Sequence, residues 1–310
     1  MISGIFKIIG KLFVAFYVIK AYVIFYVRSL SLKRAVIAVL FMTFLFNMMI
    51  SMNLFSTETG FDTLKKAYNN QNRGKLNAAH KSFEQAFNKF EQEKSNPGMF
   101  SSLSSMGDMD FLLNDHNEAL MHYDQALRMA RKLNDTNNQI NMLMKHGDVN
   151  LRMKHSNVAR SHYYDAIKIA QATGSNNSAA SLYTKIGNLD RDNGNDRNAR
   201  FSYINALNIY KLQNDKQGQA NIYWNIAALE RKSDNYNAAR TAYITARDIF
   251  KSGGNTYNEA TVTKHMARLE KNLGSTDEAS SLYSEAANLY ASIGSTKALD
   301  ALKTEIAEMF

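Results

Sequence analysis

The 310-residue chain contains no cysteine and a single proline, Pro97. Without cysteine the protein forms no disulfide and offers neither a thiolate metal ligand nor a cysteine nucleophile. Residues 1–57 contain no aspartate or glutamate, whereas they carry six lysine and arginine side chains. Most of the formal charge of +9 therefore belongs to this segment, because the 31 basic and 28 acidic residues that follow give only +3. This small excess does not indicate a nucleic-acid-binding surface, so no nucleic-acid partner is expected.

A stretch without any charged side chain runs from Ala35 to Phe55. As a helix its 21 residues would span about 31 Å, close to the thickness of a bilayer core, which predicts a transmembrane helix at residues 35–56. The basic and apolar residues 1–34 are expected either to span as well or to lie in the membrane interface. Three basic side chains directly precede the predicted span, so the rest of the chain is expected on the non-cytoplasmic side, in the periplasm or its organellar equivalent. The prediction is an integral membrane protein that contacts lipid through residues 1–56.

Beyond this segment the sequence repeats itself at a fixed interval of 40 positions. Each copy has an alanine, an aromatic residue four positions later and a second alanine three positions after that. The copies are Ala79, Phe83, Ala86; Ala119, Tyr123, Ala126; Ala159, Tyr163, Ala166; Ala199, Tyr203, Ala206; Ala239, Tyr243, Ala246; and Ala279, Tyr283, Ala286. Six copies in one register indicate a single array of repeats, although the chain is long enough for two ordinary domains.

Each repeat is expected to hold two α-helices. Its apolar residues recur at helical spacing, and clusters of glycine, asparagine and aspartate interrupt them. A small residue twelve positions before the first alanine is expected to let the two helices approach closely, at Ala67, Gly107, Gly147, Gly187, Ala227 and Ala267. We predict six repeats over residues 57–295 and a single amphipathic helix over residues 296–310 that caps the last one.

The small residue, alanine, aromatic residue and alanine at these spacings resemble the tetratricopeptide repeat family across residues 59–310. Repeats of that family usually run about 34 residues, so the longer period indicates an extended subclass, similar to the arrays of kinesin light chains and bacterial peptide sensors. The resemblance implies an all-α fold, a right-handed α-α superhelical solenoid, here preceded by one or two membrane helices. One departure is that polar residues stand three positions after the small residue, at Asp110, Asn150, Asp190, Glu230 and Glu270.

In arrays of this kind the first helices line a concave groove, and the resemblance implies that partner peptides bind there. Helical spacing defines one stripe of side chains on these helices, which changes from acidic and apolar to basic along the array. We expect Trp224 and Phe111 to anchor apolar groups and the basic residues to hold acidic ones, so the partners are proteins or peptides, including acidic segments. The predicted partner-binding groove comprises Asp108, Phe111, Met144, Asp148, Arg191, Trp224, Arg231, Lys264, Arg268 and Lys271. The alternative is a solvated helix face with Trp224 partly in the core.

No sequence motif indicates catalysis. The chain has no phosphate-binding loop, no dinucleotide fingerprint, no nucleophile elbow and no H-E-x-x-H metal motif. Residues 190–196 resemble a calcium-binding loop, but the glycine is misplaced and no glutamate closes the loop, which favours a helix turn. We therefore predict a protein that is not an enzyme and uses no metal or cofactor. The function favoured is a membrane-anchored scaffold or assembly factor that recruits partners; the alternative is a peptide-sensing regulator that changes curvature when ligand binds.

Overall fold

The computed structural model describes residue 43 and residues 58–307. Within residues 58–307 the chain forms 13 α-helices and no strand. The helices are α3 (Gly60–Asn72), α4 (Leu76–Gln92), α5 (Asn96–Leu113), α6 (His116–Lys132), α7 (Thr136–Arg152), α8 (Ser156–Ala172), α9 (Asn176–Asp192), α10 (Asp196–Leu212), α11 (Lys216–Lys232), α12 (Tyr236–Ser252), α13 (Thr256–Asn272), α14 (Thr276–Ser292) and α15 (Thr296–Ala307). The prediction of an all-α fold is confirmed for this part of the chain.

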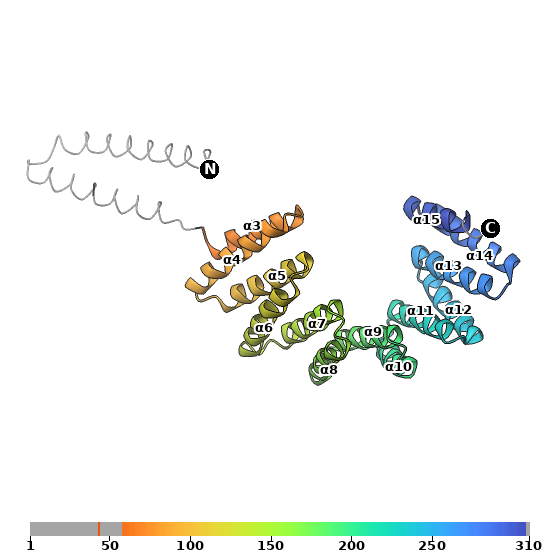
Figure 1. The fold of residues 1–310 in the computed structure, drawn as a ribbon, viewed down its shortest axis with the longest axis horizontal. Coiled ribbons are helices and arrows are strands. Elements are labelled where there is room, and N and C mark those ends of the chain that lie inside the picture. Colours follow the sequence, from red (N-terminus) through yellow and green to blue (C-terminus); the bar gives the residue numbers. More distant parts are fainter. Residues whose placement is uncertain (1–42, 44–57, 308–310) are drawn as a thin grey trace, which may run out of the picture. The chain divides into compact units, whose positions relative to one another are not determined.

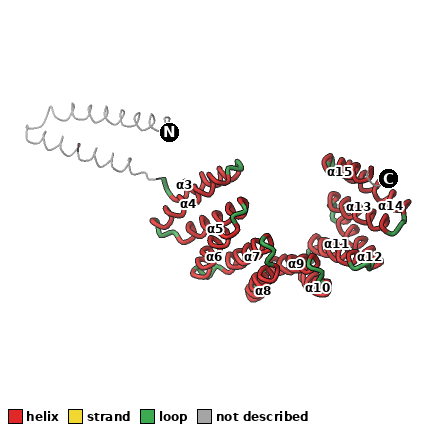
Figure 2. The backbone as a smooth tube through the Cα atoms, viewed as in Figure 1, coloured by secondary structure: helices red, strands yellow, loops and turns green. Residues whose placement is uncertain are grey.

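From α4 onward each helix packs against the next one in the chain, as far as α15 (Figure 1). Figure 2 shows that only short loops separate the helices. The odd-numbered helices α3 to α13 are the first helices of the predicted repeats, and the even-numbered helices α4 to α14 are the second helices. This succession confirms the stacked helical solenoid. Its right-handed superhelix and its division into repeats and cap stay predictions.

The alanine and aromatic residues of the repeated pattern form the core. All twelve alanines have no exposed surface, and the six aromatic side chains are at most 2% exposed. The small residues of the first helices face these rings. A Cβ atom added to Gly107, Gly147 or Gly187 would lie less than 3.0 Å from the tyrosine ring of the second helix of the same repeat. The expected close approach of the two helices is therefore confirmed in the three repeats that have glycine at this position.

The turns reveal a shorter period than the sequence pattern does. A residue with positive φ stands at every twentieth position from Gly74 to Gly294. The residue that follows it returns a backbone hydrogen bond to the end of the preceding helix, as Ser175 does to the carbonyl of Ala170 at 2.8 Å. Glycine fills six of the twelve positions, while asparagine, aspartate and lysine fill the others, including Lys154 with φ of 64°. Each structural unit is one helix and its turn, and two such units make one repeat of the sequence pattern.

The predicted localisation as an integral membrane protein is corrected by the structure. In the part of the chain that the structure describes, no helix is long and apolar enough to cross a bilayer. The buried apolar side chains of these helices pack against neighbouring helices in the core of the array. Residues 1–34 and nearly all of residues 35–56, to which the membrane and lipid predictions applied, lie outside the described residues.

Candidate functional site

Ion pairs connect the first helices of successive repeats. On α5, the Asp108 carboxylate accepts a hydrogen bond from the hydroxyl of Tyr123 at 2.7 Å and two from Lys145 of α7 at 2.6 and 2.8 Å. On α7, Asp148 accepts the equivalent hydrogen bonds from the tyrosine and lysine 40 positions further along, at 2.6 and 2.7 Å. Each carboxylate therefore ties a buried tyrosine to the next repeat. We call this series of contacts the ladder.

The charges of the ladder are exchanged at the C-terminal end. Arg268 of α13 stands where the first repeats have aspartate, and Glu305 of α15 stands where they have lysine. The guanidinium donates to both carboxylate oxygens at 2.5 and 2.6 Å, and the Tyr283 hydroxyl donates to the same carboxylate at 3.3 Å. The hydrogen bond from Arg268 lowers the pKa of the Glu305 carboxyl. A carboxylate again receives hydrogen bonds from a tyrosine and a cation. In this repeat α15 supplies the carboxylate and α13 supplies the cation.

Between these ends the ladder loses its charges. Asn188 of α9 accepts a hydrogen bond from the Tyr203 hydroxyl at 2.7 Å, and Asn225 occupies the position of the lysine. One repeat further, on α11, the acceptor position is Ala228, and the lysine position is His265 of α13. Alanine has no oxygen in its side chain, and no other side chain of the described residues accepts a hydrogen bond from the Tyr243 hydroxyl in this repeat.

A second set of polar pairs connects the second helices α4, α8, α10 and α12 to the first helix of the following repeat. These acids are the polar residues noted three positions after the small residue, and all are at most 4% exposed. Their partners lie 30 positions earlier in the chain, in the pairs His80–Asp110, Arg160–Asp190, Arg200–Glu230 and Arg240–Glu270. Where Leu120 replaces the cation, the buried residue is the neutral Asn150. In the three arginine pairs a buried acid and a cation occur together, as burial of charge requires.

One of these pairs brings together potential metal ligands. His80 and His122 lie on either side of the buried Asp110, at 3.0 and 2.6 Å from its two carboxylate oxygens, and the three ligand atoms lie within 4.8 Å of one another. A closed structural zinc site has four protein ligands, one more than this cluster offers. His80 also stands where later repeats have arginine. We therefore assign the cluster to the pairing of the buried carboxylate.

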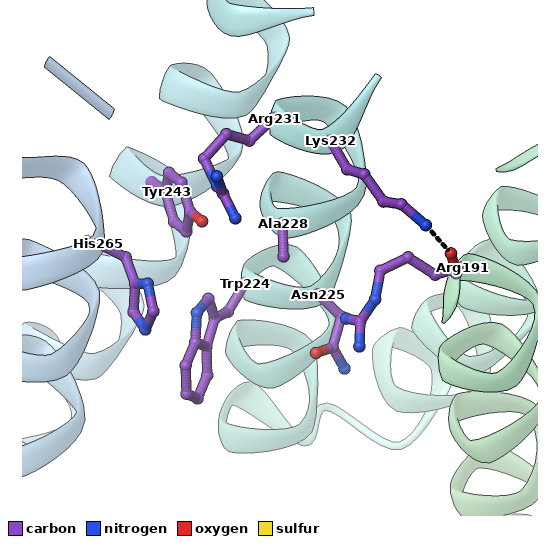
Figure 3. A pocket seen from close by; sticks show the side chains of 8 residues that line it. All are labelled: Arg191, Trp224, Asn225, Ala228, Arg231, Lys232, Tyr243 and His265. Carbon is purple, nitrogen blue, oxygen red and sulfur yellow. Dashed lines mark hydrogen bonds between the residues drawn. The ribbon is translucent and has the colours of Figure 1, made fainter. Parts of the chain in front are cut away.

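A pocket of about 440 Å³ opens where the ladder lacks its carboxylate (Figure 3). Side chains from four helices line it: Arg191 of α9; Trp224, Asn225, Ala228, Arg231 and Lys232 of α11; Tyr243 of α12; and His265 of α13. The side chains of Trp224, Tyr243 and His265 face the cavity, and the Arg231 guanidinium lies beside the tyrosine hydroxyl. The lining therefore combines three cationic side chains with three aromatic rings and contains no acid.

The pocket is positively charged at neutral pH. Burial lowers the pKa of His265 to about 4, and the charges of Arg268, Lys264 and Arg231 contribute to this shift, so the imidazole is neutral. Burial raises the pKa of the Tyr243 hydroxyl, which keeps its proton. Within residues 58–307 Arg231 belongs to no ion pair, whereas Arg191 pairs with the exposed Asp192 at 3.1 Å. Arg231 is thus a cation whose charge no carboxylate of the described chain neutralises.

The structure separates the predicted groove residues into different environments. Arg191, Trp224 and Arg231 meet in the pocket, while Asp108, Asp148 and Arg268 belong to the ion pairs of the ladder. Phe111 is half-buried and lies 5.7 Å from the Arg152 guanidinium. Met144 lines a second, asparagine-rich pocket of about 340 Å³ between α7 and α9. Lys264 and Lys271 are half-buried on α13. Binding of a partner by any of these residues stays a prediction.

Five lining residues were not among those predicted: Asn225, Ala228, Lys232, Tyr243 and His265. Tyr243 had been assigned only to the core pattern. Two of the others stand in a series that recurs at every fortieth position, Lys145, Lys185, Asn225, His265 and Glu305. The loss and reversal of charge along this series was visible in the sequence and could have indicated the position of the pocket.

Two stacked histidines make stability dependent on pH. The rings of His146 and His162 lie 5.1 Å apart at 27°. Burial lowers the pKa of both, that of His146 from 6.5 to about 4. The unfolded chain therefore takes up protons first as the pH falls, so the stability contribution of His146 is complete above pH 6.5 and is lost toward pH 4.

We expect His146→Phe to flatten the decline of unfolding free energy between pH 6.5 and pH 4, measured by urea denaturation at each pH. His162, Asp124 and Arg131 are the charged or titratable groups that act on this imidazole, and the variant leaves them in place. The control variant is His155→Gln, which replaces an exposed histidine. Identical slopes for wild type and His146→Phe would contradict the prediction.

Comparisons with known proteins support the tetratricopeptide resemblance for part of the array. A model of the tetratricopeptide repeat family matches residues 218–292, and a model of the soluble NSF attachment protein family matches residues 114–246. No curated protein sequence matches the chain. The membership of an extended 40-residue subclass stays a prediction.

Several solved structures share this fold. BtubC (BKLC) from P. vanneervenii has a TM-score of 0.61 at 17% identity, over 71% of this chain and 91% of that chain. The apo form of RapI has a TM-score of 0.61 at 15% identity, over 81% and 90% of the two chains. A Rap protein complexed with Competence and Sporulation Factor has a TM-score of 0.52 at 14% identity, over 84% and 79%. At these identities the similarity shows the fold alone.

Proposed function

We propose that the protein is a non-enzymatic scaffold or assembly factor that recruits a protein partner through the first helices of its array. The observation that carries this proposal is the pocket at Trp224, where Arg231 has no carboxylate beside it. Elsewhere along the ladder the cations are neutralised within the chain, by Asp108, Asp148 and Glu305. A cationic and aromatic pocket favours an acidic segment of a partner, because aromatic and arginine side chains dominate binding energy at interfaces.

The comparisons support the same kind of function. The structure of a Rap protein complexed with Competence and Sporulation Factor shows that an array of this fold binds a partner. Tetratricopeptide-like arrays present a row of first helices to such a partner, and here the row includes Met144 in its second pocket as well as Trp224. The proposed partner segment is extended and lies along this row, with its acidic part toward α9, α11 and α13.

Charge reversal on this face tests the proposal. We expect Arg231→Glu, Lys264→Glu and Lys271→Glu in one full-length chain to reduce capture of partners at least tenfold, measured by affinity purification and quantitative mass spectrometry. The control reverses three exposed cations on the second helices, Lys81, Lys132 and Lys251, and makes the same change in net charge. Circular dichroism melts establish that both variants fold.

The proposal requires that capture of the same partners survives in the control and falls in the first-helix variant. Equal capture by both variants would contradict it, because recognition would then not involve this face. Failure of the wild-type chain to retain any partner above a tag-only sample would contradict it as well.

A second candidate, a sensor that changes its curvature when ligand binds, has one observation in its favour. The buried core is divided into three clusters, which cover residues 67–189, 199–229 and 220–302. The pocket is lined by Arg191, which follows the last residue of the first cluster, and by His265, which falls within the residue range of the third. A ligand that contacts α9, α11 and α13 together would bias the angle between these helices. Small-angle scattering that is unchanged by saturating partner segment would contradict this candidate.

A further inference from the structure

The ladder shows which chemical group its tyrosines require. Tyr123 and Tyr163 donate to aspartates, Tyr203 donates to an asparagine, and Tyr283 donates to a glutamate, with oxygen distances from 2.6 to 3.3 Å. In three of these four cases the acceptor is a carboxylate that also binds a lysine or an arginine. The fold therefore repeats one arrangement, a carboxylate held by a tyrosine hydroxyl and a cation.

Tyr243 is the exception in this series. Within residues 58–307 its hydroxyl donates to no carboxylate or amide, because the position of the aspartate is occupied by Ala228. The tyrosine and the cation of the arrangement are nevertheless present, since the Arg231 guanidinium lies beside the Tyr243 hydroxyl (Figure 3). The pocket of about 440 Å³ lies where the missing carboxylate would stand.

We propose that this pocket binds the carboxylate of a glutamate or aspartate side chain from a partner peptide, which supplies the acceptor that Ala228 lacks. The carboxylate accepts hydrogen bonds from the Tyr243 hydroxyl and the Arg231 guanidinium. Arg191 supplies a second positive charge from α9, and Trp224 covers the methylene groups of the acidic side chain. This assignment deepens the proposed function and rests on it.

The chain contains an internal example of the complex. Glu305 approaches from α15 and places its carboxylate on Arg268 and Tyr283, which stand 40 positions after Ala228 and Tyr243. In the first repeats the acid lies on the same helix as the small residue, as Asp108 does on α5. Here the acid, Glu305, lies on α15, whereas Arg268 on α13 occupies the position equivalent to Asp108. A partner segment in the pocket would present its acid from outside the array in the same manner. The ligand chemistry thus follows from the contacts of the protein itself.

Trp224 is the only tryptophan of the chain, so its fluorescence reports on the pocket directly. The probe is an acetylated and amidated peptide with two adjacent glutamates between glycine and serine residues, and the matched probe has glutamine in their place. We expect saturable fluorescence changes with the glutamate peptide and at least tenfold weaker binding of the glutamine peptide.

The decisive variant is Ala228→Asp, which restores the carboxylate found at Asp108 and Asp148. We expect this variant to fold, to satisfy Tyr243 internally and to bind the glutamate peptide at least tenfold more weakly. Ala238→Asp adds the same charge at an exposed position of α12 and should leave binding unchanged. Arg231→Gln provides a second variant that keeps the backbone and removes the cation, with the same expected loss.

Equal binding of the two peptides, wild-type affinity in Ala228→Asp, or equally tight binding of inorganic phosphate would each overturn the carboxylate assignment. If the glutamate peptide does not bind while charge reversal still abolishes partner capture, this assignment fails and the proposed function stands. If capture is insensitive to charge reversal, the proposed function itself fails.

Discussion

Replacing Arg240 with leucine is expected to lower the unfolding free energy by about 3 kcal/mol or more, because Glu270 would be left buried without a cation. The glutamate is 1% exposed, and the guanidinium binds both of its oxygens at 2.7 and 2.6 Å. Arg240 lies on α12 and Glu270 on α13, so the pair joins two repeats. Urea denaturation followed by circular dichroism measures the loss, and hydrogen exchange locates it at α12 and α13.

The array provides its own rescue for this variant. At the equivalent position of an earlier repeat, Leu120 replaces the cation and the buried residue is Asn150, which donates to the carbonyl of His146 at 2.9 Å. The double variant Arg240→Leu with Glu270→Asn should therefore regain most of the lost stability. Arg128→Leu, which removes an exposed ion pair on α6, should cost less than about 1 kcal/mol. A loss in Arg240→Leu no larger than in Arg128→Leu would refute the account of the buried pairs.

A valine at Gly147 is expected to destabilise the array by about 3 kcal/mol, since overpacking of a closely packed core carries costs of this size. A Cβ atom at this position would lie less than 3.0 Å from the Tyr163 ring, which has no exposed surface. The ring cannot move away without breaking its hydrogen bond to Asp148. We expect lower stability in urea and a weaker helix contact between α7 and α8.

Ala238→Val is the control for this experiment, because it introduces the same side chain at an exposed helical position on α12. Its cost should be limited to the lower helix propensity of valine, roughly 0.5 kcal/mol. Wild-type stability in Gly147→Val would show that the glycine does not set the distance between the two helices.

The core of the fold could be predicted from the sequence because its signal is strictly local and periodic. Alanine, aromatic residue and alanine recur at every fortieth position, and their burial follows from helical spacing alone. The shorter unit of one helix and its turn was not evident, since Gly174, Lys154 and Asn134 all occupy its positive-φ position. The positive φ is retained at these positions while the residue type varies, so comparing the amino-acid sequences of the repeats does not reveal the 20-residue unit.

The buried ion pairs illustrate a second limit. The polar residues after the small positions were evident as departures from the family pattern, but their partners lie 30 positions earlier, on the preceding second helix. A helical stripe describes one face of one helix and contains no information about which neighbouring helix meets it. The pairing of Leu120 with Asn150, in contrast to that of Arg240 with Glu270, could have suggested the contact.

The same limit applies to the candidate site. The predicted groove included Asp108, Arg231 and Arg268, and helical spacing alone could not show which of them form ion pairs within the chain. The structure places the first and last of these in ion pairs with Lys145 and Glu305, each 37 positions further along the chain, and leaves the second beside a pocket. Recognition is therefore expected where the repeated pattern is interrupted, and scaffold stability where it is kept.

The central claim is that a partner's carboxylate takes the place of the aspartate missing at Ala228. A crystal structure of the full-length chain with the glutamate peptide tests it most directly. The account predicts a glutamate carboxylate within hydrogen-bonding distance of the Tyr243 hydroxyl and the Arg231 guanidinium, with the peptide lying across the first helices. A peptide bound to the second helices, or one whose glutamates point into solvent while Tyr243 stays without an acceptor, would contradict the account.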